Sequence, residues 1–527
     1  MSALNLGWLQ QAPPEKKQRC TCGVPECVRA RVWSLAPLSL AVFFGCMLAF
    51  LGPKAWPSVT QKHGLYVVIG FIAGFVLEHT KIGFSRGFRV MLSIGRTLTF
   101  RIQIVAISVT SIVVAVLYTY PLQIGTYVIK PSLSTDSISV ALVVGAFLFG
   151  IGMQLANCCA SGVLAYCGDG TIKGWVVLVF FIAGSTLGAW TEPWWWSFGK
   201  VPSAKSTSLL ELWPLPWALL AQGGICLFAF VFAWVVEGLL YGRRSVQHLR
   251  CETADETEFR VMEEQQFVQA DQSNMPDPVT SSSAYGAFPG LAAPLISDSV
   301  NGDMHSPGAG GAAGGAQGAQ CCSKFWLRLF NGWNDWFGAA GLILVQLLLI
   351  VVVGGLWGIS GVFALWGSKL LYLMGVPVDQ WDYWKGSPAL ASPFFANMVT
   401  DLNLSIILGA TFGTMLSRQW CQPSNPFAMP WRHWISHILG GLLLGYGSRI
   451  AHGCNIGAYF SGTASLSLHG WLWLVAALLG NWLADRLLRP LFRLHVDRLE
   501  KGQAGSMCSG CAPKKAEPSP YNGVTEI

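Results

Sequence analysis

Two cysteines stand in the same local pattern in two distant parts of the chain. Residues 145–188 and 440–484 each contain a glycine-rich apolar run, a cysteine followed after two residues by glycine, a short loop, and a Gly-Trp pair that opens another apolar run. With one inserted residue in the second copy the segments align, pairing Cys159 with Cys454, Gly150 with Gly445, Gly152 with Gly447, Gly162 with Gly457, Gly174 with Gly470, Trp175 with Trp471 and Gly184 with Gly480. A thiol at the same place in both copies is a candidate functional group.

These cysteines have the chemistry to contact an anion that contains sulfur. A thiol is a weak S–H donor, and its polarizable sulfur is a weak acceptor. If Cys159 and Cys454 lie at the starts of short helices, backbone N–H groups and the helix dipole favour an anion at the same spot. Several weak contacts suit conduction, since a tightly held ion does not leave. The alternative is that both thiols only pack, as buried cysteines commonly do.

A second pair of matched segments precedes the cysteine loops. Residues 83–88 and 358–363 share the pattern Gly-x-Ser-x-x-Phe, which pairs Ser85 with Ser360. Each copy of the repeat therefore has two short loops after apolar spans, one with Gly-x-Ser and one with Cys-x-x-Gly. We expect these four loops to dip toward one another and to bring both hydroxyl groups to the substrate.

Further polar residues lie beside the paired cysteines or near them. Asn157 and His452 occupy equivalent positions two residues before them, where they either donate hydrogen bonds to an anion or cap the preceding helix. Glu192, at the end of a predicted span, is expected to reach the membrane interface. The candidate substrate-binding residues are Cys159, Cys454, the neighbouring Cys158, Ser85, Ser360, Asn157 and His452.

The composition of the 527-residue chain indicates a membrane protein. Hydrophobic residues make up 52% and charged residues 12%, which excludes an ordinary soluble protein. The net charge of +7 does not indicate nucleic-acid binding, because lysine and arginine are spread through loops and flanks, where they orient a membrane protein. We predict an all-α polytopic fold with ten transmembrane helices, at 34–52, 64–79, 101–120, 138–156, 173–192, 214–240, 338–357, 398–417, 434–452 and 470–489.

The spans divide into two halves around a segment of different composition. Residues 243–325 contain an acidic patch and Ser/Pro-rich and Gly/Ala-rich tracts, which cannot bury a core and predict a disordered linker. The expected domains are a cytosolic N-terminal tail at 1–33, a first transmembrane half at 34–242, the linker, a second half at 326–495 and a cytosolic C-terminal tail at 496–527.

Charge in the loops predicts the orientation of the spans. If ten spans alternate, both tails and the basic loops fall on one side, which we place in the cytosol beneath the plasma membrane. The first repeat, residues 64–192, then starts outside, and the second, residues 338–489, starts inside. Such inverted repeats are a recurring transporter architecture with the site at their interface. Loops 159–168 and 454–465 are too short to span, and we expect them to be re-entrant.

Four motifs carry a resemblance to a known family: KIGFSRGFR at 81–89, GIGMQLANCCASG at 150–162, GISGVFALWG at 358–367 and GYGSRIAHGCNIGAYFSGTASLSLHGW at 445–471. In these motifs the chain resembles the YeeE/YedE family of membrane sulfur transporters, whose characterised members take up thiosulfate. The resemblance implies an hourglass-like protein built from inverted repeats. It also implies that central loop cysteines, at Cys159 and Cys454 here, contact thiosulfate.

Two departures from the family pattern bear on this path. Many members carry Gly-Gly-Cys in the first cysteine loop, where this chain has Asn157-Cys158-Cys159. Many also carry a cysteine in the first short loop, at the position of Gly83. A relay of three thiols therefore requires Cys158 or Cys167 to take the missing place.

The predicted function is a membrane transporter, not an enzyme, that takes up an inorganic sulfur anion, with thiosulfate first among the candidates. We expect no cofactor and no metal. The expected partners are the anion, the lipid bilayer and a candidate cytosolic sulfur-handling protein, without nucleic acid. The alternative is a membrane sulfurtransferase in which Cys159 carries a persulfide, a chemistry that usually needs a nearby base. No histidine accompanies Cys159 in the sequence, which counts against it.

Overall fold

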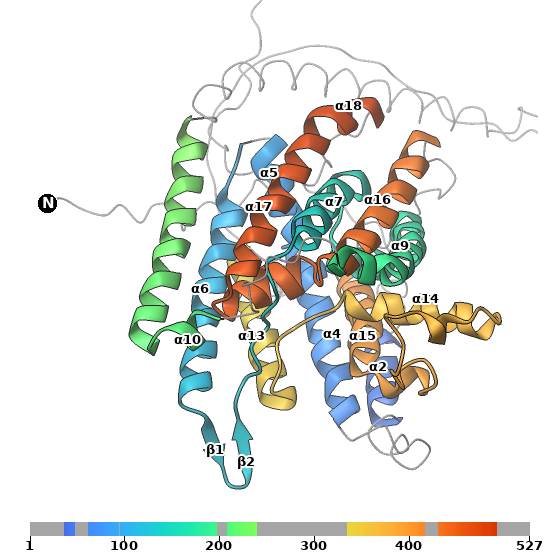
Figure 1. Cartoon of the computed structure of the whole chain (residues 1–527), viewed down its shortest axis with the longest axis horizontal. Coiled ribbons are helices and arrows are strands. Elements are labelled where there is room, and N and C mark those ends of the chain that lie inside the picture. The colour runs from blue at the N-terminus through green and yellow to red at the C-terminus, as the bar shows by residue number, and fades with distance from the viewer. Residues whose placement is uncertain are drawn as a thin grey trace, which may run out of the picture. The chain divides into compact units, whose positions relative to one another are not determined.

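The computed structural model describes residues 36–47, 62–93, 95–197, 208–239, 335–416 and 431–492 (Figure 1). Contacts divide the chain into two units, one made of Met1–Gly238 and Leu329–Ile527 and the other of Leu239–Arg328. Every described residue except Leu239 belongs to the first unit. The predicted linker at 243–325 and the predicted tails at 1–33 and 496–527 lie outside the described residues.

The described part of the chain is built almost entirely from helices. Eight helical segments in it are long and apolar enough to cross a bilayer: Lys62–Ser93, Leu98–Thr119, Val140–Gly168, Ile172–Ser197, Leu215–Leu239, Asp335–Val353, Met398–Leu416 and Leu468–Phe492. A bilayer core offers no water to backbone N–H and C=O groups, and a helix satisfies them within one segment. The prediction of an all-α polytopic membrane protein is confirmed.

Several of these segments contain more than one helix. The first holds α4 (Lys62–Thr80) and α5 (Phe84–Ser93), the third α7 (Val140–Ala156) and α8 (Ala160–Gly168), and the last α17 (Leu468–Leu483), η8 (Ala484–Leu488) and α18 (Arg489–Phe492). The remaining labelled spans are α6 (Leu98–Thr119), α9 (Ile172–Ser197), α13 (Asp335–Val353) and α15 (Met398–Leu416). Shorter helices are α10 (Leu209–Leu212), α14 (Gly361–Leu373), η3 (Val378–Gln380) and η4 (Phe394–Ala396).

Two of the ten predicted spans are not among the eight segments. The span predicted at 34–52 coincides in part with α2 (Ala36–Cys46), and its remainder is not described in full. The span predicted at 434–452 forms α16 (Trp431–Ile450), a helix of 20 residues that carries Arg432, His433, His437 and Arg449. Helices α7 and α9 pack against α16. Of its polar side chains, His437 is buried against this packing, while Arg432, His433 and Arg449 are partly exposed.

The described ranges contain one β-sheet, a two-stranded antiparallel hairpin. Strand β1 (Leu122–Ile124) pairs with β2 (Tyr127–Ile129), with Ile124 opposite Tyr127. The two-residue turn between them places Gly125 at φ 61°, a conformation that favours glycine. The hairpin connects α6 to the extended segment that leads into α7.

The helices that precede the two cysteine loops cross in opposite directions. Gly145 of α7 lies against Ala451, which follows α16, and a Cβ at Gly145 would come within 2.7 Å of the Ala451 nitrogen. Gly440 of α16 lies against Ala156, the last residue of α7. Because Gly145 and Gly440 are equivalent in the alignment, the same contact occurs twice with the roles of the helices exchanged.

The same exchange holds for the helices that follow the loops. Gly445 of α16 lies against the Phe181 carbonyl of α9, and the equivalent Gly150 of α7 lies against the Ala477 carbonyl of α17. A side chain at either glycine would overlap that oxygen atom. Small residues at such contacts allow helix backbones in a membrane protein to approach closely, which favours helix association.

We expect Gly445→Leu to lower the free energy of unfolding by about 3 kcal/mol or more, because the leucine must push the α9 backbone away. The control is Gly223→Leu, since a Cβ at Gly223 in the helix Leu215–Leu239 meets nothing within 4 Å. Thermal unfolding of the detergent-solubilised protein measures both variants. Equal Tm values for the two would contradict the close contact at Gly445.

Candidate functional site

Each of the paired cysteines lies immediately before a short helix, as the sequence predicts. Cys159 precedes α8, and Cys454 precedes the π-helix η7 (Asn455–Gly462). Both have an extended backbone, with φ −108° and ψ −177° at Cys159 and φ −127° and ψ −170° at Cys454. Both residues are 0% exposed. The first N–H groups of a helix lack partners within that helix, so each thiol lies at an end that attracts negative charge.

The residues two positions before the cysteines anchor the loops. Asn157 and His452 both have left-handed backbone, with φ 60° and φ 50°. Arg89 donates to the backbone oxygen of Asn157 at 3.0 Å and also to its side-chain oxygen. His452 contacts Asp136 through Nδ1 at 2.8 Å and Glu192 through Nε2 at 2.5 Å. Of the two interpretations open for this pair, the structure supports termination of the preceding helix; donation to an anion stays a prediction.

The charged surroundings of His452 favour its protonated form. Burial disfavours the charge, but hydrogen bonds to Asp136 and Glu192 outweigh that effect and raise the pKa of His452 above its ordinary value. The ring also stacks on Trp196, with the ring centroids 4.1 Å apart. Glu192 therefore holds the second cysteine loop, a role that the expectation of a simple interface residue missed.

The sulfur of Cys454 is surrounded by donors from two different loops. Backbone N–H groups of Ile456 and Gly457 and the hydroxyl of Ser360 hydrogen-bond to it. Ser360 comes from the segment that precedes α14, so the second Gly-x-Ser loop meets the second cysteine loop as predicted. At the first cysteine, the Ser161 hydroxyl lies 3.4 Å from the Cys159 sulfur.

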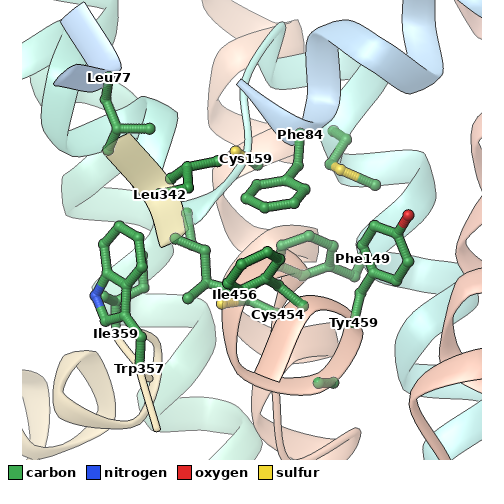
Figure 2. Packing of buried hydrophobic residues seen from close by; sticks show 14 of the residues in the cluster. Leu77, Phe84, Phe149, Cys159, Leu342, Trp357, Ile359, Cys454, Ile456 and Tyr459 are labelled. Carbon is green, nitrogen blue, oxygen red and sulfur yellow. The ribbon is translucent and has the colours of Figure 1, made fainter. Parts of the chain in front are cut away.

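Figure 2 shows Cys159 and Cys454 within one cluster of buried apolar side chains, which also contains Phe84, Ile456 and Tyr459. The thiol of Cys159 is an electrostatic neighbour of Cys454. The rings of Phe84 and Tyr459 meet edge to face, with centroids 5.9 Å apart, so α5 packs against η7. A hydrogen bond in such apolar surroundings is stronger than one exposed to water.

Cys158 lies on the cationic side of the first loop. It is 1% exposed, and Arg89 and Lys173 are its positively charged electrostatic neighbours. Cys167 lies near the far end of α8. Cys158 is therefore the thiol that is placed beside Cys159 and beside two cations.

Ser85 is buried on α5 but makes no hydrogen bond to either sulfur among the described residues. The structure thus brings Ser360, and not Ser85, into contact with a paired cysteine. A Cβ at Gly83 would lie 3.7 Å from the Ser85 hydroxyl oxygen, its single neighbour within 4 Å. The place where many family members carry a cysteine therefore has room for one.

Open space and an arginine border the second site. A Cβ at Gly358 would meet nothing within 4 Å, and one at Gly361 would meet only Nη1 of Arg449, at 3.8 Å. The Arg449 guanidinium lies 5.0 Å from the centre of the Tyr383 ring. Its Nε is buried without a hydrogen-bond partner in the described part of the chain. A cation whose buried Nε–H has no partner in the described ranges thus stands beside the loop that carries Ser360.

Sequence reasoning missed the charged residues that surround the two loops. Arg449 lies in the last turn of a predicted span, where a lone arginine reads as an interface residue. Asp136, in the connection before α7, is 316 residues away in the sequence from His452, which it binds. Arg89, in α5, is 68 residues away from Asn157. In the structure, the residues that these charged side chains bind, Asn157 and His452, are both recognisable by their left-handed backbone.

Residues 79–303 and 311–483 match the family model described as sulphur transport. These ranges contain both Gly-x-Ser segments and both cysteine loops. The chain belongs to this family. The resemblance predicted from four motifs is confirmed, and with it a multi-pass membrane protein.

Curated relatives carry transporter names. The chain is 34% identical over 158 residues to a probable transporter YedE of Escherichia coli, which is 29% of this chain and 38% of that protein. It is 22% identical over 426 residues to the thiosulfate transporter TsuA of Spirochaeta thermophila, which is 79% of this chain and 96% of that protein. The match thus spans under half of YedE and nearly the whole of this TsuA.

We expect His452→Gln to lower the Tm more at pH 5.5 than at pH 8.5. A raised pKa in the folded state means that His452 stabilises the protein below its unfolded pKa of about 6.5 and loses this effect as the pH rises through the folded value. The control is His433→Gln in α16, whose ring stacks on that of His437, and it should lower the Tm less at pH 5.5 than His452→Gln does. An equal loss of Tm at both pH values would show that charge on His452 does not hold the loop.

Proposed function

We propose that this protein is a membrane transporter that takes up an inorganic sulfur anion, with thiosulfate as the leading candidate. The observation that carries the proposal is the convergence of the Ser360 hydroxyl and two backbone N–H groups on the Cys454 sulfur, with Cys159 as its electrostatic neighbour. A sulfur anion could accept from the same donors and contact the polarizable thiols. The name of the TsuA relatives supports thiosulfate.

We infer that the two halves are inverted repeats and that the cysteine loops are re-entrant. Support comes from the antiparallel crossing of α7 and α16, in which Gly145 meets Ala451 and Gly440 meets Ala156. A twofold axis in the membrane plane would exchange these contacts. It would send Cys454 into the protein from outside and Cys159 from the cytosol. Both termini would then be cytosolic, and the plasma membrane is the proposed location.

The proposed path runs from the open space beside Arg449 to Cys454, Cys159 and Cys158. Arg449 attracts the anion by its charge, and its Nε–H has no other partner in the described part of the chain. The two thiols in the apolar cluster hold the anion only weakly, so that it moves on. Cys158, beside Arg89 and Lys173, takes the place of the family thiol that is missing at Gly83.

Asn157 and His452 act in this scheme by holding the loops, because both ring nitrogens of His452 already bind Asp136 and Glu192. Ser360 donates at the second cysteine, and Ser85 is proposed for the corresponding place in the first half. A cytosolic sulfur-handling protein would receive the anion at the Cys158 end. The domain boundaries expected from the sequence remain part of the proposal.

The alternative sulfurtransferase has weaker support. A persulfide carrier must expose its thiol to a sulfur acceptor, whereas Cys159 and Cys158 are 0% and 1% exposed. The hydrogen-bond neighbour of Cys159 is the Ser161 hydroxyl rather than a base. The relatives are also named as transporters.

We expect Cys454→Ala and Cys159→Ala each to lower uptake of radiolabelled thiosulfate into proteoliposomes by about tenfold or more, which is the loss of one good contact in the path. Cys226→Ala, which removes another buried thiol outside the repeats, is the control and should keep normal uptake. Normal uptake by the Cys159/Cys454 double variant would sink the proposed path. A stable, transferable persulfide found by mass spectrometry would favour the sulfurtransferase instead.

We expect Arg449→Gln to raise the KM for thiosulfate by about tenfold, because a hydrogen bond to a charged group is worth about 1.5–3 kcal/mol. Arg449→Lys should be intermediate, since lysine keeps the charge but not the fork of donors. The control is Arg432→Gln at the other end of α16, where the arginine lies over the Trp431 ring. An unchanged KM in Arg449→Gln would remove Arg449 from the path.

A further inference from the structure

A histidine and an aspartate form a buried pair away from the cysteine loops. Nδ1 of His63, in the first turn of α4, lies 2.6 Å from Oδ2 of Asp401, in the first turn of α15. Both side chains are 0% exposed. Removing such a pair from water is costly, and it rarely adds stability. Ionisable residues buried in membrane helices are candidates for function by default.

The second polar atom of each partner is unused. Nε2 of His63 and Oδ1 of Asp401 are buried without hydrogen-bond partners among the described residues. With Asp401 ionised and His63 neutral, the Nδ1–H donates to the carboxylate, so Nε2 carries a free lone pair. That lone pair can accept a proton, which changes the charge of the pair from negative to neutral without breaking the bond between the partners. An unsatisfied atom on each partner of a buried ionisable pair calls for an explanation.

The pair is connected to the loop that carries Ser360. Asn403, two residues after Asp401, donates from its side-chain amide to the Ile359 carbonyl at 3.0 Å. Ile359 directly precedes Ser360, whose hydroxyl contacts the Cys454 sulfur. The backbones of α4 and α15 are also in contact, since Gly74 lies against the Ile406 carbonyl. One hydrogen bond thus connects α15 to the loop that carries Ser360, and Ser360 in turn meets the second cysteine loop.

We propose that the His63–Asp401 pair binds a proton that is taken up together with the anion. The inference rests on the proposed transport of a sulfur anion. An inside-negative potential opposes each negative charge that moves inward, so a dianion such as thiosulfate is opposed twice. A proton carried at Nε2 of His63 in the same cycle reduces the charge moved, and the inward proton gradient drives accumulation.

Few other titratable groups lie around the pair. Tyr66 on α4 is 5% exposed and is an electrostatic neighbour of Asp401. The exposed Lys62 directs its ammonium to the Tyr127 ring, 5.9 Å away. The described part of α2 and the helices α8 and η4 carry no charged residue, and Asp335, the one charge on α13, lies near the opposite end of α4. Among the described residues of this region, His63 and Asp401 are thus the directly bonded pair of a base and an acid.

The test compares accumulation with exchange in proteoliposomes that contain the full chain. Wild type should concentrate radiolabelled thiosulfate under an inward proton gradient, and a protonophore should abolish this. Asp401→Asn and His63→Gln should each lose gradient-driven accumulation by about tenfold or more while equilibrium exchange of labelled for unlabelled thiosulfate stays within about twofold. Glu78→Gln is the control, because Glu78 is another buried carboxylate on α4, bound to Lys81 instead of a histidine; it should keep both activities.

Proton uptake by solubilised protein gives a second measurement. In weakly buffered solution with a pH-sensitive dye, thiosulfate should cause wild type to take up protons and should cause no uptake by Asp401→Asn. Accumulation by Asp401→Asn at the wild-type level would overturn the coupling, as would loss of exchange together with accumulation, which indicates a structural role only. Exchange that persists without any effect of the proton gradient in wild type would overturn the coupling but leave the transport proposal standing. Absence of exchange in wild type would overturn both.

Discussion

The cysteine loops interrupt helical hydrogen bonding in a buried, apolar region, so other groups of the protein must hold their backbone. Water cannot do so there, and an unsatisfied backbone group is costly. Arg89 meets this need at Asn157, and the carboxylates of Asp136 and Glu192 hold His452. Both loops turn through a left-handed residue and then present a cysteine at the start of a short helix. The two sites thus share a backbone geometry while the charges that stabilise it have opposite signs.

Close helix contacts carry this geometry from one half to the other. Gly150 and Gly445 allow α7 and α16 each to touch the backbone of a helix from the other half. The two contacts involve equivalent positions of the two halves, so the same kind of helix packing occurs twice. The polar α16 is accommodated since α7 and α9 pack against it.

Equivalent positions of the two aligned segments differ in charge. Arg449 corresponds in the alignment to Gln154, and both have buried side-chain atoms without hydrogen-bond partners in the described ranges. Equivalent positions of the two halves therefore carry a cation in one half and a neutral amide in the other. The thiols also differ, with Cys158 adding a second sulfur only in the first half. In the proposed function these differences give a symmetric fold a direction.

The sequence by itself determined eight of the ten predicted spans, the duplicated pattern and the pairing of Cys159 with Cys454. Those features are local, because an apolar run must be helical in a bilayer and a repeated motif can be read within a single segment. It also supported the family through four motifs. Of the candidate site, it identified both cysteines and Ser360 but assigned no partner to Asn157 or His452.

Only the tertiary structure decided which side chains hold the loops and which serve elsewhere. His452 and Asp136 are 316 residues apart in the chain, and His63 and Asp401 are 338 apart. No periodicity connects such positions, since each pairing depends on how distant helices cross and on where glycine lets their backbones touch. The sequence also could not separate Ser85 from Ser360: they occupy the same motif, but only Ser360 meets a paired cysteine. A sequence pattern shows what a segment can do, and packing decides which neighbour it meets.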